Sequence, residues 1–244
     1  MLLWPVTLAL SVAGSVGGLL TSSVLLLFDD NAQKRVVPWL VSYAVGTLLG
    51  AALLGLVPQA LSTLAPTAAL GALLAGILTF FVLEKLVLWR HCHDDGSCEI
   101  HKSTVTLLII GDAVHTFVDG VVITAAALIS LPLGATTALA VAAHEIPQEA
   151  GDFGILLAAG YSRTRALLLN LASAGGGLLG AALMLVFGTQ APNVVPYVLS
   201  FAAGNFLYVA MADLIPNLHR GALDRSAIRQ VILIVLGVLT ILAL

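Results

Sequence analysis

Seven ionisable side chains lie close together in two consecutive apolar stretches near the middle of the chain. The first stretch carries Asp112, His115 and Asp119, whose i, i+3, i+7 spacing places them on one face of a helix. The second stretch carries His144, Glu145, Glu149 and Asp152, and the neutral amide of Gln148 lies among them. Imidazole and carboxylate groups together suit borderline divalent metals such as Zn²⁺, Fe²⁺, Mn²⁺ or Cd²⁺ more than Ca²⁺ or Mg²⁺.

The composition indicates that both stretches lie in a membrane. The chain has 244 residues, of which 59% are hydrophobic and only 9% are charged, against roughly 25% charged residues in soluble domains. A water-soluble enzyme and a nucleic-acid-binding protein are thereby excluded. Since a membrane-spanning helix needs about 20 apolar residues, we expect an all-α, polytopic integral membrane protein of the inner or plasma membrane. Residues 1–244 are expected to form one transmembrane transporter domain in contact with the lipid bilayer.

Apolar runs between polar or Pro/Gly breaks predict eight membrane-spanning helices. They are expected near residues 4–27, 38–61, 67–89, 103–129, 134–159, 164–188, 195–215 and 227–244. The ten basic residues then all lie at one side of the membrane, at Lys34, Arg35, Lys85, Arg90, Lys102, Arg163, Arg165, Arg220, Arg225 and Arg229. The positive-inside rule assigns that side to the cytoplasm and both termini to the outside.

A comparison of the chain with itself, shifted by 158 positions, predicts an inverted repeat. The shift places residues 42–44 (SYA) on residues 200–202 (SFA), and Pro58 on Pro216. Helices 1–3 and 6–8 would then be related about a central pair, helices 4 and 5, in a 3+2+3 arrangement. Inverted repeats with binding sites near the bilayer midplane recur in transporters.

Charged side chains in the interior of a membrane need a compensating opposite charge. An ionisable group at the bilayer centre costs at least about 2.5–3.5 kcal/mol, and facing carboxylates repel one another unless they are protonated or bridged by a cation. No Lys or Arg lies among the seven groups, so a divalent cation is the simplest compensating charge. The alternative is that these side chains form hydrogen bonds between helices or sit at helix ends.

The two stretches closely resemble the HNxxDG and HExPHExGD motifs of the ZIP family of divalent-metal transporters. Here they read HTFVDG at residues 115–120 and HEIPQEAGD at residues 144–152. Residues 80–85 (FFVLEK), and residues 204–210 with Asp213 and Pro216, are similar to further family segments. The resemblance implies uptake of a divalent cation into the cytoplasm, Zn²⁺ before Fe²⁺, Mn²⁺ or Cd²⁺. It also implies a transporter rather than an enzyme, a homodimer, no organic cofactor, and movement of helices 1, 4, 5 and 6 against 2, 3, 7 and 8.

Departures from the family pattern favour a single metal site over a two-metal centre. Thr116 replaces the usual Asn, Gln148 replaces the usual second His, and residues 175–177 are glycines where a helix 6 Glu helps to hold a second metal. We expect the ligands to be His115, Asp119, His144 and Gln148. Glu145 and Glu149 are expected to be secondary ligands or groups of the exit path. Secondary positions along the transport path are expected at Asp112, Thr116, Asp152 and Asp213.

A second group of metal-binding residue types follows the third expected helix, in the connection 90–102. It comprises His91, Cys92, His93, Cys98 and His101. Two interpretations stay open: a loop that receives or senses metal on the cytoplasmic side, where thiols stay reduced, or a flexible polar connector.

Two other functions fit part of the pattern. HExxH motifs bind Zn²⁺ in metal-dependent hydrolases, but Gln148 stands where the second His is needed. A proton-coupled carrier could instead use the carboxylates as relays without transporting metal. Proton flux stimulated by metal, with no metal flux, would favour that carrier.

Overall fold

The computed structural model describes residues 3–25, 28, 30–89, 102–218 and 225–244, and within these residues it contains helices and no β-strand. The α-helices are α1 (Leu3–Leu25), α2 (Asp30–Gly50), α3 (Val57–Leu61), α4 (Pro66–Trp89), α5 (Lys102–Ile129), α6 (Leu131–Ala158), α7 (Arg163–Gln190), α8 (Val195–Tyr208), α9 (Ile215–Leu218) and α10 (Arg225–Ala243). Two π-helical segments, η1 (Ala51–Leu56) and η3 (Val209–Leu214), join α2 to α3 and α8 to α9, and a short 3₁₀ turn, η2 (Pro192–Val194), precedes α8.

The helices have the length and composition of membrane spans. Seven helical stretches among the described residues are long and apolar enough to cross a bilayer. The eighth, α6, has 28 residues, and its imidazole, amide and carboxylate groups lower its hydropathy. Helices suit this environment because every backbone N–H and C=O must be paired inside the segment where no water is present. The prediction of an all-α polytopic membrane protein is confirmed.

The second expected helix begins earlier than predicted. We expected its start near Pro38, but α2 begins at Asp30 and contains Pro38 in its interior. The prediction followed the apolar run, and the helix continues beyond that run through polar residues. The Ser42 hydroxyl donates to the carbonyl oxygen of Pro38 at 2.6 Å.

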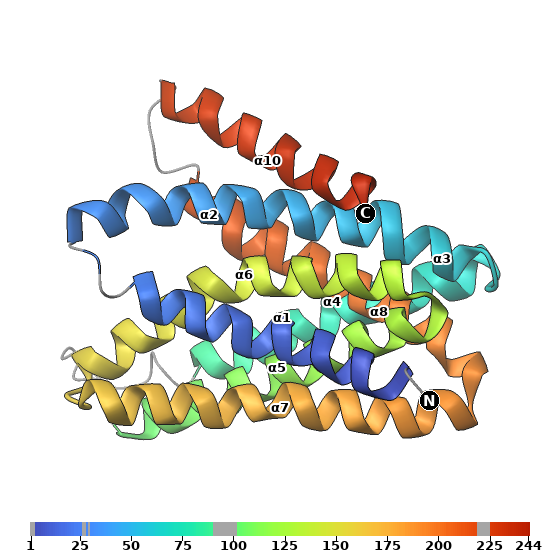
Figure 1. Ribbon diagram of the computed structural model, residues 1–244, viewed down its shortest axis with the longest axis horizontal. Helices are drawn as coiled ribbons and strands as arrows, with labels where there is room; N and C mark the ends of the chain where they lie inside the picture. The colour runs from blue at the N-terminus through green and yellow to red at the C-terminus, as the bar shows by residue number, and fades with distance from the viewer. Residues whose placement is uncertain (1–2, 26–27, 29, 90–101, 219–224) are drawn as a thin grey trace.

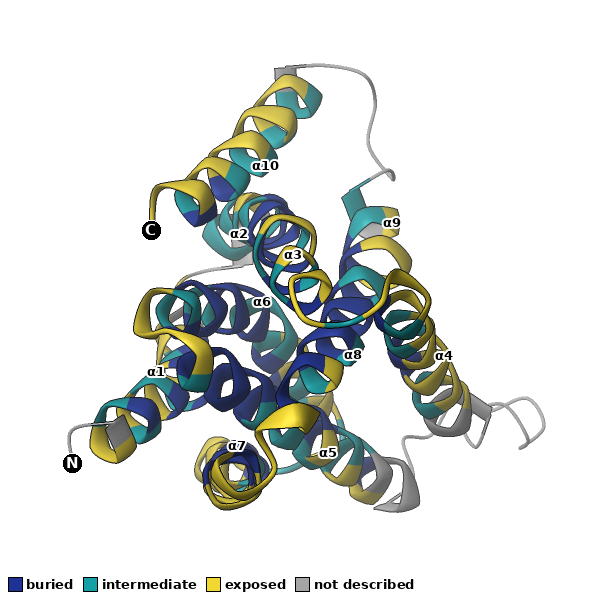
Figure 2. Ribbon diagram, turned by 90° about the vertical axis from the view of Figure 1, so that its right-hand side faces the viewer, coloured by how far each residue is buried: buried dark blue, intermediate teal, exposed yellow. Residues whose placement is uncertain are grey.

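The helices form a bundle of four close pairs. The helix α5 packs along α7, and α1 packs along α6, while α2 packs along α10 and α4 along α8 (Figure 1). Seen end-on, the buried residues gather at the centre of the bundle, and the exposed faces of α4, α7 and α10 point outward (Figure 2). The exposed residues on those faces are largely Leu, Ile, Val and Phe, as expected for surfaces that contact lipid.

Glycines allow the closest of these approaches. Gly46 on α2 faces the backbone of Ile234 on α10, and Gly204 on α8 faces the backbone of Leu73 on α4. A Cβ at either glycine would collide with a carbonyl group of the partner helix. Small residues let membrane helices pack backbone to backbone. The two glycines are 158 positions apart, so equivalent contacts occur at positions that the self-comparison pairs.

The two π-helical segments lie at equivalent positions as well, since η1 and η3 are also 158 residues apart. In each segment a backbone N–H reaches back five residues, from Val57 to the Ala52 oxygen in the first and from Ile215 to the Ala210 oxygen in the second. A proline, which has no N–H to donate, follows one residue later in both cases. Single π-helical turns inside α-helices are frequent at functional sites.

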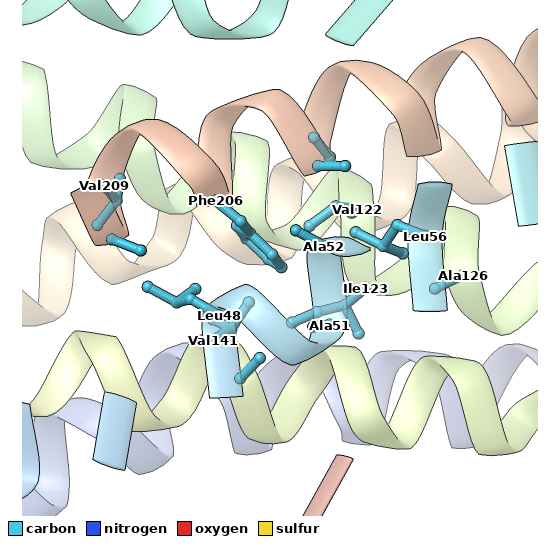
Figure 3. Close-up of a cluster of buried hydrophobic side chains, with 14 of the residues drawn as sticks. Leu48, Ala51, Ala52, Leu56, Val122, Ile123, Ala126, Val141, Phe206 and Val209 are labelled. Carbon is cyan, nitrogen blue, oxygen red and sulfur yellow. The ribbon is translucent and has the colours of Figure 1, made fainter. Parts of the chain in front are cut away.

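Apolar side chains form a continuous core at the centre of the bundle. Figure 3 shows part of this core, where side chains of α2, η1, α5, α6, α8 and η3 meet. The labelled residues are Leu48, Ala51, Ala52, Leu56, Val122, Ile123, Ala126, Val141, Phe206 and Val209. Most of them are fully buried, so water does not reach these side chains.

Candidate metal site

Four of the predicted site residues come together between α5 and α6. One ligand atom from each of His115, Asp119, His144 and Glu145 lies within 4.8 Å of the others. His115 Nε2 and His144 Nε2 are 3.1 Å apart, and each lies 3.4 Å from Asp119 Oδ2. The Glu145 carboxylate is 4.0 Å from His115 Nε2. Metal–ligand bonds of about 2.0–2.1 Å place the ligand atoms of tetrahedral Zn²⁺ about 3.3 Å apart, so the three shortest distances are close to the edges of such a site.

A hydrogen bond sets the tautomer of one imidazole. His144 Nδ1 lies 3.0 Å from the carbonyl oxygen of Ala140. A carbonyl oxygen only accepts hydrogen bonds, so Nδ1 carries the proton and donates it. In the neutral ring the lone pair is then on Nε2, the atom that faces His115 and Asp119. Metal-binding histidines usually have their second nitrogen held in this way.

The carboxylates of the cluster lack hydrogen-bond donors. Both oxygens of Asp119, of Glu145 and of Glu149 are buried without a hydrogen-bond partner, and all three residues are fully buried. Buried polar groups are ordinarily paired, because an unpaired one costs about 1–3 kcal/mol or more when charged. Six such oxygens in one region match the requirement of a divalent cation for anionic ligands.

Asp112 and Thr116 belong to a polar contact between α5 and α7. The Ser173 hydroxyl donates to Asp112 Oδ2, and Gln148 Nε2 donates to the other carboxylate oxygen at 3.5 Å. The Thr116 hydroxyl donates to the carbonyl oxygen of Ser173 at 2.8 Å. The expected ligand Gln148 therefore has Asp112 as its hydrogen-bond partner, and its role as a metal ligand stays a prediction. Ser173 was not among the expected site residues.

The remaining predicted residues lie outside the group of four. Glu149 is buried one turn beyond Glu145 on α6, Asp152 is partly buried further along the same helix, and Asp213 is exposed on η3. The predicted loop cluster His91, Cys92, His93, Cys98 and His101 lies outside the described residues.

Two aromatic rings complete the surroundings of the site. Phe80 on α4 contacts the ring of His115, with ring centroids 5.4 Å apart, and Phe206 on α8 contacts the ring of His144 at 6.0 Å. Both phenylalanines belong to segments that resemble the family, but neither was an expected residue of the site. Their position depends on how α4 and α8 pack against α5 and α6, which spacing along one helix does not reveal.

Comparison with known proteins gives the same family. A family model described as ZIP Zinc transporter matches residues 90–244. Zinc transporter ZIP13 from Pongo abelii is 35% identical over 216 residues, which cover 82% of this chain and 64% of the relative. Zinc transporter ZIP13 from Mus musculus is 32% identical over 263 residues, with 89% of this chain and 72% of the relative covered. Zinc transporter YKE4 from Saccharomyces cerevisiae is 29% identical over 233 residues, with coverage of 84% and 67%.

This chain therefore spans about two thirds of the length of those relatives. The matched region of the family model includes α5, α6 and all four clustered residues, and the fold is the helical membrane bundle that the motifs implied. Relatives of this kind are transporters rather than enzymes. The chain belongs to the ZIP zinc transporter family.

Proposed function

We propose that this protein carries a divalent cation, Zn²⁺ in the first place, across a cell or inner membrane into the cytoplasm. The observation that carries the proposal is the buried group His115, Asp119, His144 and Glu145, whose ligand atoms lie within 4.8 Å of one another. Fe²⁺, Mn²⁺ and Cd²⁺ are further substrates that imidazole and carboxylate ligands accept. Gln148 and Glu149 are proposed as additional ligands or as the next groups that a departing cation meets.

The distribution of polar groups supports movement toward the cytoplasm. From the cluster, Asp112 on α5 and Glu149 and Asp152 on α6 continue toward the end of the bundle where the basic residues Lys102 and Arg163 begin α5 and α7. In the opposite direction along α5, the side chains that follow Asp119 are apolar and buried, at Val122, Ile123 and Ala126. A cation in the cluster is therefore separated from the extracytoplasmic side by packed side chains, and it has carboxylates ahead of it on the cytoplasmic side.

Equivalent helix contacts support a 3+2+3 inverted repeat. Under the shift of 158, α1 corresponds to α7 and α2 corresponds to α8. The contact of α1 with α6 is then equivalent to that of α7 with α5. In the same way, the contact of α2 with α10 is equivalent to that of α8 with α4. In such repeats alternating access arises when one half-bundle moves against the other around a central site. We propose that α1, α5, α6 and α7 move together against α2, α4, α8 and α10. Both termini are placed outside the cytoplasm, and a homodimer is the proposed assembly.

Metal uptake into proteoliposomes tests the proposal. The purified protein is expected to move Zn²⁺ into vesicles that contain a fluorescent chelator, and the double variant His144→Ala with Asp119→Ala is expected to lose this uptake. Glu84→Gln is the control, because Glu84 accepts a hydrogen bond from the Tyr208 hydroxyl outside the cluster and an amide oxygen still accepts it. Uptake that survives in the double variant would show that the site is elsewhere.

The same assay separates the proton-coupled alternative. With a pH gradient imposed and a pH-sensitive dye inside the vesicles, a carrier that relays protons without metal would acidify them and leave the chelator signal unchanged. A series of Zn²⁺, Fe²⁺, Mn²⁺ and Cd²⁺ in otherwise identical vesicles ranks the substrates.

A further inference from the structure

Four aromatic rings form a row across the metal site. The imidazoles of His115 and His144 are the inner pair, with centroids 5.3 Å apart and planes at 78°. Phe80 meets the first imidazole at an interplanar angle of 70°, and Phe206 meets the second at 60°. Both phenylalanines are buried, with 7% and 1% of their surface exposed. The imidazoles are thus enclosed on two sides by hydrocarbon.

The enclosing rings and the enclosed rings come from different helix pairs. His115 and His144 belong to α5 and α6, whereas Phe80 and Phe206 belong to α4 and α8. The helices α4 and α8 are held in close contact, because a Cβ at Gly76 on α4 would collide with the backbone of α8. The wall that the phenylalanines form is therefore fixed by the packing of its own two helices.

The wall of phenyl rings limits how many ligands, and which ligands, a cation in the site can bind. Phenyl rings supply no ligand, and a water molecule needs two to four polar partners to be retained in a buried position. A cation between the imidazoles can then take no ligand from the α4–α8 side, and the clustered ligand atoms come from the side chains of α5 and α6. Zn²⁺ is satisfied by four nitrogen and oxygen ligands, whereas Mn²⁺ and Mg²⁺ favour six, several of them water.

We propose that Phe80 and Phe206 are specificity-determining residues, which favour four-coordinate Zn²⁺ by excluding water ligands from the α4–α8 side of the site. This inference rests on the proposed function, since it concerns the cation held by the same cluster. Neither phenylalanine touches the metal in this mechanism. They exclude water from the space beside the metal, and they hold the two imidazoles in position.

Cobalt spectroscopy tests the proposal without relying on transport. Tetrahedral Co²⁺ absorbs visible light much more strongly than six-coordinate Co²⁺, so the spectrum of the Co²⁺-loaded protein reports the number of ligands. Intense tetrahedral bands are expected for the wild type, and weaker bands for Phe206→Ala and Phe80→Ala, where water can enter. The variants Phe206→Leu and Phe80→Leu keep most of the hydrocarbon volume and are expected to retain the intense bands. Phe80→Ala, with its site at the edge of the core, provides the test should Phe206→Ala fail to purify as a single species.

Phe81→Ala is the matched control. Phe81 is adjacent on α4, but it is 46% exposed and contacts the ring of Tyr208 instead of an imidazole. Competition uptake provides the second measurement: the preference for Zn²⁺ over Mn²⁺ is expected to fall about ten-fold in the alanine variants, the lower end of the range for groups that surround metal ligands, and to stay unchanged in Phe81→Ala.

Two results would overturn the inference. One is a six-coordinate Co²⁺ spectrum in the wild type, and the other is an unchanged spectrum and metal preference in both alanine variants. In either case Zn²⁺ uptake by the wild type still stands, so the proposed function survives. Absence of Zn²⁺ uptake by the wild type would instead contradict the proposed function itself.

Discussion

Replacing Glu145 by Gln tests whether the two buried carboxylates of the site need a bound metal cation to offset their mutual repulsion. Both oxygens of Glu145 are buried without a hydrogen-bond partner, as are those of Asp119, and the ligand atoms of the two carboxylates lie within 4.8 Å. At that separation two unit charges repel by about 3 kcal/mol at an effective dielectric constant of about 20. The amide keeps the shape of the side chain and removes this repulsion.

We therefore expect Glu145→Gln to be more stable than the wild type in the absence of metal and to gain less from Zn²⁺. For domains of about 150–250 residues, 1 kcal/mol shifts the melting temperature by roughly 2–4 °C, so relief of about 3 kcal/mol corresponds to roughly 6–12 °C. The wild type should recover the difference when Zn²⁺ is added, since a ligand at 100 times its Kd stabilises the folded state by about 2.7 kcal/mol.

Thermal unfolding of the detergent-solubilised protein, with chelator and across a Zn²⁺ titration, measures both quantities. Glu84→Gln serves as the control, with a change of at most about 0.5 kcal/mol expected at this partly exposed position. An apo melting temperature for Glu145→Gln at or below that of the wild type, or a Zn²⁺-dependent rise equal to the wild-type rise, would refute the reasoning.

Three further substitutions, the first with a matched control, distinguish effects on helix packing from effects on transport. Gly176→Ala places a methyl group against the backbone of α5 and the Thr116 hydroxyl and should cost about 1–3 kcal/mol in thermal unfolding, whereas Gly175→Ala, which faces open space, should be neutral. Thr116→Val removes the 2.8 Å hydrogen bond to the Ser173 carbonyl and should cost about 1 kcal/mol by the same measurement; no loss would mean that this bond does not hold α5 against α7. Glu149→Gln should slow Zn²⁺ uptake into vesicles yet keep the Zn²⁺-dependent rise in melting temperature, and loss of that rise would make Glu149 a primary ligand.

Much of the fold was predictable because the bilayer restricts what a backbone can do. Helices follow from apolar runs of sufficient length, since unpaired backbone groups are excluded from hydrocarbon. The clustering of His115 with Asp119 was predictable from i, i+4 spacing on one helix. The approach of His144 to them followed from the expectation that adjacent helices bring their ionisable faces together.

Details that depend on side-chain partners across helices were not predictable in this way. Gln148 occupies the same i, i+4 relation to His144 that Asp119 has to His115, which predicts a ligand. In the structure Gln148 donates to Asp112. The amide of Gln148 has N–H groups that need an acceptor, whereas the carboxylate of Asp119 has none. Ser173 contributes to the same contact from α7, and only the close packing of α7 on α5 places it there.

Contacts that recur at positions 158 apart show why helix packing is easier to infer from the sequence than the ligands are. Gly18 on α1 lies against Glu145 on α6, and Gly176 on α7, 158 positions later, lies against Thr116 on α5. The two contacts are equivalent, and Glu145 and Thr116 are 29 positions apart, as are His144 and His115. Comparing the chain with itself therefore recovers the contacts between backbones.

The chemistry resides in the positions where equivalent residues differ. Of the pair Glu145 and Thr116, one supplies a carboxylate to the cluster and the other anchors α5 to α7 through a hydrogen bond. Of the pair Asp119 and Gln148, one turns toward the imidazoles and the other away to Asp112. Among these pairs only the two histidines are alike, and their Nε2 atoms lie 3.1 Å apart. Equivalent backbone contacts thus enclose an asymmetric ligand set, in which the carboxylate of Asp119 on α5 and that of Glu145 on α6 come from positions that the shift of 158 does not make equivalent.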